Sequence, residues 1–240
     1  MTFPFRPSTL EERKRFYKQE FSIKNVKNFF KRNKIKIPQI CALDAGTETG
    51  IILDKKLKNT MLYLPFSELK QKIEKYIPED VYYDRNTYSN PGNVIKRLNF
   101  DNWLSQELVF DIDSDNIKCT HPKNQPLCKK CLKKAYKSTI GMKEKLKDYF
   151  QKMIIIYSGR GFHIHILDKK ADNLTTKERE RLNKIFSKFP IDPWVSRGYI
   201  RLIRMPYSLN SLVSRKVIPL YKKDKLNEKD IIPNFLKIKD

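Results

Sequence analysis

Two aspartates, Asp111 and Asp113, stand one residue apart at the end of an apolar run that begins at Leu108. The run is typical of a β-strand, on which side chains two residues apart point to the same face. Both carboxylates should therefore project together, with Ile112 facing the other way. Like charges held this close repel each other and are unfavourable when buried without a partner. A divalent cation such as Mg²⁺ or Mn²⁺, which also binds phosphates, is the usual compensation. The alternative is an acidic strand end that runs into a loop.

A glycine-containing turn, Ser158 to Gly161, joins two further strand-like runs. Its two glycines, Gly159 and Gly161, would let backbone amides approach an anion closely, and Arg160 offers a bidentate phosphate contact. His163 and His165 follow on the second run and should share one face of it. The alternative for either histidine is a buried core position with a satisfied hydrogen bond. A second metal site at these histidines would lack further cysteine or histidine partners.

A short segment after the aspartates gathers three of the four cysteines of the chain. Cys119 and His121 form a C-x-H pair, and Cys128 and Cys131 form a C-x-x-C pair. This is a Cys₃His ligand set for a tetrahedral zinc ion, and a site with four protein ligands is structural rather than catalytic. Disulfides are the alternative, but we expect a reducing compartment. We predict a zinc-binding insert at about residues 114–135. Lysines surround it, and they could contact a nucleic-acid backbone or form a solvated cluster: Lys118, Lys123, Lys129, Lys130, Lys133 and Lys134.

The charge balance favours a polyanionic partner. The chain has 50 Lys and Arg against 27 Asp and Glu, a formal net charge of +23. Basic side chains that neutralise phosphates release condensed counterions, so nucleic acid is the favoured partner. The alternative is the lysine bias of a whole proteome. No run approaches the roughly 20 apolar residues of a membrane span, and the start of the chain has no apolar leader core. We therefore expect a cytoplasmic, nucleoid-associated protein with no membrane partner.

The order of predicted elements is mixed α/β within one domain, 1–240. We predict helices at 10–31, at 67–75 with Ser67 as the N-cap, at 133–152 and at 175–186. Thr175 and Glu178 have the spacing of a capping box. The predicted strands are 35–53, with a turn at 45–50, and 81–83, 108–113, 153–157, 162–167, 199–205 and 213–221.

Taken together, the Glu107–Asp113 run, the cysteine-rich segment and the Ser158–His165 segment resemble the catalytic small subunit of archaeal and eukaryotic DNA primases, in both order and spacing. The segment Ile191–Gly198 resembles the motif of that family which carries a third carboxylate, here Asp192. The segment Ile200–Leu209 resembles a motif in which a basic residue meets nucleotide phosphates.

The resemblance implies a role for each matched residue. Asp111, Asp113 and Asp192 would hold catalytic Mg²⁺ or Mn²⁺, and the zinc would be structural. The glycine turn, a histidine and basic side chains would bind the incoming nucleotide. These residues are Ser158, Gly159, Arg160, Gly161, His163, Arg201 and Arg204. Two alternatives without a functional role stay open, namely Asp192 as a turn residue before Pro193 and Arg204 as a surface cation.

The resemblance also implies a fold, an activity and partners. We expect the mixed-sheet archaeo-eukaryotic primase core flanked by helices, with the zinc knot inserted after the D-x-D strand. The expected activity is synthesis of short RNA or DNA primers de novo on single-stranded DNA for replication, from nucleoside triphosphates and by a two-metal mechanism. The expected partner is a large primase subunit with an iron–sulphur domain, on a separate or fused chain. The zinc ligands leave too few cysteines for such a cluster here.

The chain also departs from the family pattern. Asn210 stands where the family usually has a histidine, and we expect Arg201 or Arg215 to replace the lost contact. Between Asp168 and Asp192 only one helix fits, so the helical insert of the family is reduced to about 172–189. The competing interpretations are a primase-polymerase or end-joining polymerase of the same core, and a zinc-stapled nucleic-acid-binding module without catalysis.

Overall fold

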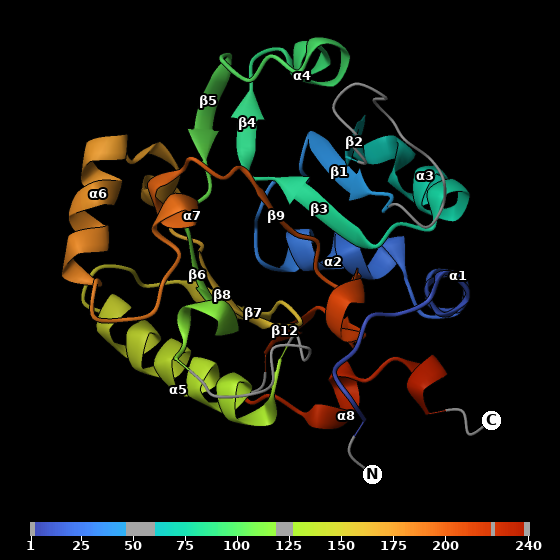
Figure 1. Ribbon diagram of the computed structural model, residues 1–240. Coiled ribbons are helices and arrows are strands. Elements are labelled where there is room, and N and C mark those ends of the chain that lie inside the picture. Colours follow the sequence, from blue (N-terminus) through green and yellow to red (C-terminus); the bar gives the residue numbers. More distant parts are fainter. Residues whose placement is uncertain (1–2, 47–60, 119–126, 222–223, 238–240) are drawn as a thin grey trace.

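The computed structural model describes residues 3–46, 61–118, 127–221 and 224–237 (Figure 1). Cys119, His121 and the predicted turn at 45–50 beyond Gly46 lie outside the described residues. The helices are α1 Leu10–Gln19, α2 Ile23–Arg32, α3 Leu69–Tyr76, α4 Pro91–Arg97, α5 Lys129–Leu146, α6 Thr176–Ile185, α7 Pro193–Arg197 and α8 Glu228–Ile231. The strands are β1 Ile40–Asp44, β2 Met61–Pro65, β3 Asp80–Asp84, β4 Asn86–Tyr88, β5 Trp103–Gln106, β6 Val109–Asp113, β7 Met153–Tyr157, β8 Gly161–Ile166, β9 Leu202–Arg204, β10 Leu209–Asn210, β11 Arg215–Lys216 and β12 Ile218–Leu220. The mixed α/β prediction is confirmed.

Two antiparallel four-stranded sheets form the centre of the described structure. The first has the order β2-β1-β3-β9, and the second has the order β12-β7-β8-β6. β4 and β5 form a separate hairpin, as do β10 and β11. β6 pairs with β8 in a register that sets Asp111 opposite His163 and Asp113 opposite Gly161. The D-x-D strand and the glycine turn are therefore neighbours in one sheet.

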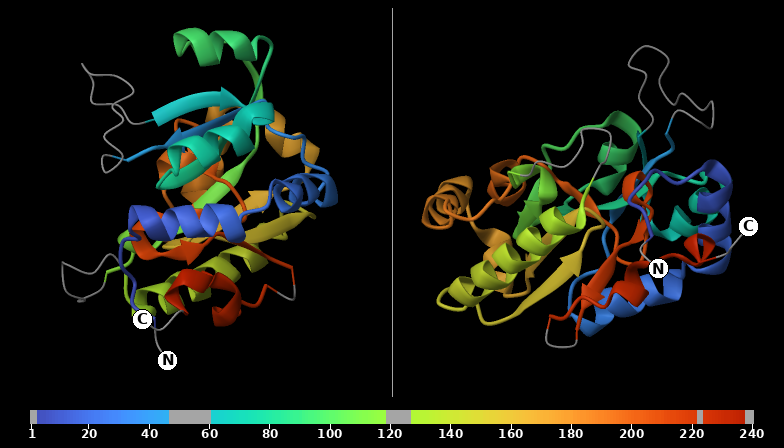
Figure 2. Two further views of the ribbon diagram at one scale, coloured as in Figure 1. Left: turned by 90° about the vertical axis from the view of Figure 1, so that its right-hand side faces the viewer. Right: turned by 60° about the horizontal axis from the view of Figure 1, so that its bottom comes forward.

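The second sheet is covered on both faces. Alternate side chains such as Val109 and Ile156 face the first sheet and share a core with helices α1, α2 and α3. The intervening residues, such as Phe110 and Ile164, face α5 on the other side. Figure 2 shows α5 running along the outer face of this sheet. Because Phe110 and Ile112 take the α5 face, Asp111 and Asp113 turn toward the first sheet, as the alternation predicts.

The helix predicted at 10–31 is wrong as a single element. The chain breaks after Glu20, and Ser22 starts α2 by accepting a hydrogen bond from the backbone amide of Asn25. The break allows Phe16 of α1 and Phe30 of α2 to enter the same core from different directions.

Two capping predictions have opposite outcomes. Ser67 does not cap α3: it lies in a 3₁₀ turn, Phe66–Glu68, and no side chain caps α3. Thr175 does cap α6, and its capping box with Glu178 is present in full. The capping prediction is confirmed for Thr175, whose side chain starts α6. It is wrong for Ser67, because a 3₁₀ turn leads directly into α3.

Several predicted boundaries differ from those observed. The helix predicted at 133–152 begins earlier, at Lys129, because Cys128 serves as its N-cap. The predicted strand 213–221 is divided into β11 and β12, and 199–205 contributes only the three residues of β9. The elements α4, α7 and the β4–β5 hairpin were not predicted. In the described part of the chain, no helix has the length and apolarity that a membrane span requires.

Candidate active site

Three carboxylates from two elements meet at the open edge of the second sheet. Asp111 and Asp113 come from β6, and Asp192 is the N-cap of α7. The backbone amide of Asp192 donates to the carbonyl of Asp111, with a nitrogen–oxygen distance of 2.8 Å. β6 ends the sheet order, so this bond fastens α7 to the side of β6 that β8 does not occupy. The structure thus brings together the three aspartates that the sequence singled out.

Asp111 is the most perturbed of these groups. Its side chain is 18% exposed, and its Oδ1 has no hydrogen-bond partner among the described residues. Burial raises the pKa of Asp111 well above its usual value, and the neighbouring charges of Asp113 and Asp192 raise it further. A carboxylate whose ionised form is opposed by both burial and like charge needs positive charge nearby.

Asp113 and Asp192 each also serve a local turn. Oδ1 of Asp113 accepts from the Ser114 hydroxyl at 3.1 Å, and Oδ1 of Asp192 accepts from the Trp194 amide at 2.8 Å. Across residues 3–46, 61–118, 127–221 and 224–237, no three His, Cys, Asp or Glu side chains form a ready group for a metal ion. The unpartnered oxygen of Asp111 beside two carboxylates still fits a cation of the Mg²⁺ type, which takes one or two protein carboxylates and fills its sphere with water and phosphate.

Two arginines bring positive charge to these aspartates. The guanidinium of Arg160, in the glycine turn, lies 3.7 Å from Oδ1 of Asp113 and also pairs with Asp115. Arg204, on β9 of the first sheet, pairs with Asp80 of β3. Burial opposes the charge of Arg204, but Asp80 more than offsets it, so the pKa of Arg204 is raised. Arg204 is therefore a largely buried cation paired with Asp80, and the alternative interpretation of Arg204 as a surface cation is wrong.

The glycine turn is tightly constrained. Gly159 has φ +101°, which L side chains rarely adopt, and a Cβ on Gly161 would lie 2.2 Å from the carbonyl oxygen of Ile112. The amide of Gly161 donates to the Ser158 hydroxyl at 3.2 Å. The Asn210 amide donates to the Ser158 carbonyl at 2.9 Å. Asn210 is therefore a brace for this turn, a role that the sequence signalled only as a departure from the family pattern.

The two strand histidines have different surroundings. His163 lies with its Nε2 3.7 Å from Oδ1 of Asp111. Burial lowers the pKa of His163 well below its usual value, and His165 and Arg204 add to the effect, so His163 is neutral at neutral pH. His165 is fully buried, and its Nδ1 is 2.8 Å from Glu107. The core interpretation thus holds for His165, while His163 faces the aspartates.

Two predicted arginines lie elsewhere. Arg201 stacks over the Phe100 ring at 3.3 Å from its centroid, and its Nε lies 3.6 Å from Asp84. Arg215 is 2% exposed and donates to four backbone carbonyls, those of Phe3, Pro4, Val213 and Ser214. The expectation that one of them replaces the missing histidine is not supported by these contacts.

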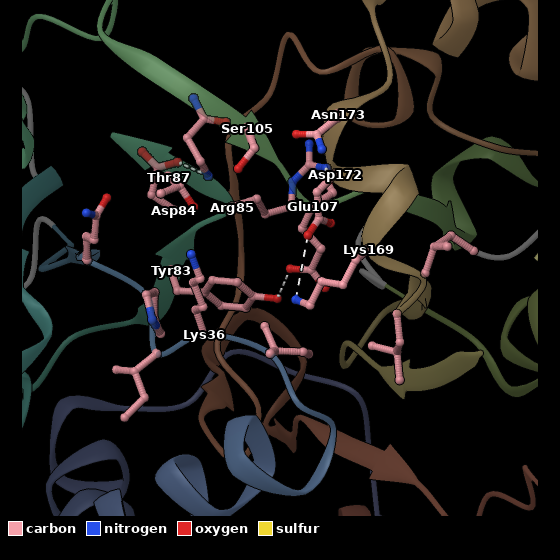
Figure 3. A pocket seen from close by; sticks show the side chains of 17 residues that line it. Lys36, Tyr83, Asp84, Arg85, Thr87, Ser105, Glu107, Lys169, Asp172 and Asn173 are labelled. Atoms are coloured by element: carbon pink, nitrogen blue, oxygen red, sulfur yellow. Dashed lines mark hydrogen bonds and ion pairs between the residues drawn. The ribbon is translucent and has the colours of Figure 1, made fainter. Parts of the chain in front are cut away.

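A polar pocket of about 380 Å³ opens on the Glu107 side of β6 (Figure 3). Tyr83 and Arg85 come from β3 and the residue after it, Glu107 precedes β6, and Lys169 and Asp172 follow β8. The Tyr83 hydroxyl donates to Glu107 at 2.7 Å. None of the three aspartates of the candidate site lines this pocket.

Two of the four predicted zinc ligands, Cys128 and Cys131, lie within the described residues. Cys128 is the N-cap of α5 and Cys131 lies in its first turn, with their sulphur atoms 3.4 Å apart. One ion could contact both sulphurs at a Zn–S distance of about 2.3 Å. The remaining cysteine, Cys41, is fully buried on β1, where burial raises the pKa of its thiol.

Comparisons with known proteins agree on a family, although no family model matches the chain. An uncharacterized DNA primase small subunit-like protein of Archaeoglobus fulgidus is 35% identical, over 90% of this chain and 85% of that protein. The DNA primase small subunit PriS of Pyrococcus abyssi is 31% identical over 78% of this chain, and that of Thermococcus sibiricus is 27% identical over 85%.

The relatives differ from this chain in length, and one solved structure is only distantly similar. The chain spans 51% and 59% of the lengths of those two PriS proteins. The polymerase domain of Mycobacterium tuberculosis Ligase D, solved in complex with DNA, matches 74% of this chain and 66% of that domain with a TM-score of 0.42 and 14% identity. This chain and the Archaeoglobus protein are 35% identical over most of both sequences. That similarity shows that this chain belongs to the family of DNA primase small subunits and small subunit-like proteins.

Proposed function

We propose that the protein is a template-directed nucleotidyltransferase that starts or extends short strands on single-stranded DNA. The observation that carries the proposal is the unpartnered carboxylate oxygen of Asp111 beside Asp113 and Asp192. The glycine turn with Arg160 leads into the neighbouring strand β8, Arg204 lies on the first sheet, and the family is that of primase small subunits. The arrangement suits a reaction between a 3′-hydroxyl and a nucleoside triphosphate.

The residues have separable roles in this proposal. Asp111, Asp113 and Asp192 would hold divalent cations, which when bound would activate the 3′-hydroxyl and stabilise the leaving pyrophosphate. Arg160 and Arg204 would neutralise the triphosphate, and the Gly159–Gly161 backbone would let it approach. Neutral His163 would hydrogen-bond to the nucleotide or its phosphates rather than add charge. Phosphoryl transfer depends mainly on such positioning and charge neutralisation.

The proposal extends to zinc and to a partner. A structural zinc at Cys128, Cys131, Cys119 and His121 would fasten the start of α5 next to the end of β6. De novo initiation needs a second nucleotide in place of a primer end. We propose that a large primase subunit with an iron–sulphur domain helps to hold this second nucleotide.

The test is strand synthesis with and without a primer. The protein is incubated with single-stranded DNA, a nucleotide mixture and Mn²⁺, beside the double variant Asp111→Ala/Asp113→Ala. Asp148→Ala, which removes an exposed carboxylate beyond α5, is the matched control. We expect products from the wild type and from Asp148→Ala and none from the double variant.

The length and the 5′ end of the products distinguish initiation by this chain alone from extension of a supplied primer. Short products with a 5′-triphosphate would show that this chain initiates alone. Extension of a supplied primer without them would indicate that initiation requires the partner. Synthesis by the double variant would contradict the carboxylate assignment, and no synthesis by any protein would favour a nucleic-acid-binding module.

A further inference from the structure

Two aromatic side chains stand exposed next to the aspartates. Trp194 is 61% exposed and Tyr199 is 52% exposed. Their ring centroids are 5.4 Å apart, and the ring planes are inclined by 58°. Both belong to α7 and the turn that follows it, and we refer to them as the aromatic pair. Exposed apolar side chains that adjoin one another are more informative than scattered ones, because contiguous apolar patches mark interaction sites.

The backbone that carries the aromatic pair is held from beneath. The buried guanidinium of Arg85 donates to the carbonyl of Val195 at 2.8 Å and also to that of Ile200. The Gln106 side chain donates to the carbonyl of Gly198 at 3.1 Å. Gly198 has φ +97°, and a Cβ there would lie 2.5 Å from Gln106. Three hydrogen bonds, one buried and two partly buried, therefore fix a short loop whose two rings are exposed, which lowers the entropy lost on binding.

The position of the pair relates it to the candidate active site. The Trp194 amide donates to the Asp192 carboxylate, and the Asp192 amide donates to the carbonyl of Asp111. The aromatic pair thus lies at the free edge of β6, whereas Arg160 and the glycine turn lie on its other side, with β8. Figure 1 shows α7 between β6 and the β4–β5 hairpin. A triphosphate at the glycine turn and a base on the aromatic pair would occupy opposite sides of the aspartates.

We propose that the aromatic pair is a stacking platform for an unpaired base of the single-stranded DNA template. The inference rests on the proposed function, because it assigns the template strand to one side of that site. Bases of any sequence stack on tryptophan and tyrosine, and this stacking contributes strongly to binding of single strands. Arg197 is a basic residue in the last turn of the same helix. Its charge and the +23 charge of the chain suit the phosphates that flank such a base.

The two tryptophans of the chain allow a direct test. Trp103→Phe leaves Trp194 as the single tryptophan, and Trp194→Phe leaves Trp103, which is 47% exposed on β5, as the matched control. Each protein is titrated with short oligo(dT), with an abasic oligonucleotide of the same length, and with thymidine triphosphate, without divalent metal. We expect oligo(dT) to quench Trp194 emission and the abasic strand to do so much less. Trp194→Ala should weaken oligo(dT) binding at least about fivefold.

Other outcomes would overturn the platform. Equal quenching of Trp194 by the abasic strand would mean that no base stacks there. A response of Trp103 without one of Trp194 would place the strand on the hairpin. Quenching of Trp194 by the triphosphate as strongly as by oligo(dT) would assign the rings to the incoming nucleotide, and no change of emission would leave the pair to a protein partner.

The platform and the proposed function can fail independently of each other. Asp111→Ala/Asp113→Ala in the Trp103→Phe background should show the same maximal quenching as its parent and bind oligo(dT) at least as tightly, because stacking needs no metal and two repelling charges are removed. Quenching without any strand synthesis would retain the platform and refute the enzyme. Strand synthesis without quenching would retain the enzyme and refute the platform.

Discussion

Asn210 shows how one residue can change its role while its position is kept. The resemblance places it where the family usually has a histidine that meets the nucleotide. In the structure Asn210 is buried, and its amide donates to the Ser158 carbonyl, beneath the turn that Gly159 and Gly161 form. Its short side chain packs directly under Gly159, where an added Cβ would lie 2.4 Å from it.

Glu107 provides a prediction for stability. It is buried, its Oε2 accepts a hydrogen bond from the Tyr83 hydroxyl, and its Oε1 lies 2.8 Å from Nδ1 of His165. Burial opposes its charge, but His165, Tyr83 and Arg85 more than offset burial and lower the pKa of Glu107. Glu107→Gln keeps the shape and removes the charge. We expect the free energy of unfolding at pH 7 to fall by about 1–3 kcal/mol.

The pH dependence follows from the sign of that shift. A carboxylate with a lowered folded-state pKa contributes its full stabilisation above its unfolded pKa, near 4.3. This contribution is lost as the pH falls through the folded value. The gap between wild type and Glu107→Gln in urea unfolding should therefore shrink below about pH 4.3. Glu144→Gln, at an exposed carboxylate on α5, is the control and should show only a small gap at either pH. A gap for Glu107→Gln that widens toward acid would contradict the assignment.

At the level of elements, the sequence predicts best what local chemistry determines. The apolar runs of β6, β7 and β8 were predicted because their alternation and β-branched residues need no distant partner. The same alternation predicted that Asp111 and Asp113 share a face, whereas the position of Asp111 opposite His163 depends on the register in which β6 pairs with β8. By contrast, α7 has five residues and holds its shape through Asp192, Arg85 and Gln106, which come from three separate segments. The pairing of Arg204 with Asp80 likewise depends on how β9 joins β3, which no local pattern reveals.

The start of α5 carries a prediction about metal. Cys128 both caps this helix and would bind zinc beside Cys131. We expect Cys128→Ser to release bound zinc and to lower the Tm, by about 2–4 °C for each kcal/mol of stability lost. Zinc content by elemental analysis and thermal unfolding are measured together. Cys41→Ser is the matched control: it places a hydroxyl in the core on β1 and should lower the Tm with zinc content unchanged. Full zinc content in Cys128→Ser would count against the predicted ligand set.

On the scale of the whole molecule, the proposed function would use the excess of positive charge in two different ways. At the aspartates, Arg160 and Arg204 are paired with carboxylates and largely buried, so they act locally. The lysines at the start of α5 are exposed, and Lys129, Lys130 and Lys133 lie within one turn and a half of the helix. Exposed lysines of this kind neutralise phosphates without reading bases. They would supply affinity, whereas the buried arginines would position the nucleotide.

The salt dependence of binding distinguishes a contacting surface from a merely solvated one. If Lys129, Lys130 and Lys133 contact the DNA backbone, each neutralised phosphate adds about 0.7 to the slope of log K against log salt for a single strand. The triple variant Lys129→Ala/Lys130→Ala/Lys133→Ala should then bind oligo(dT) with a slope shallower by about 2. Lys70→Ala/Lys72→Ala/Lys75→Ala removes the same charge from α3 and is the control. Fluorescence anisotropy across a salt series measures both slopes. If both triple variants lose affinity equally and keep the wild-type slope, the α5 lysines act only through net charge and the DNA does not contact them.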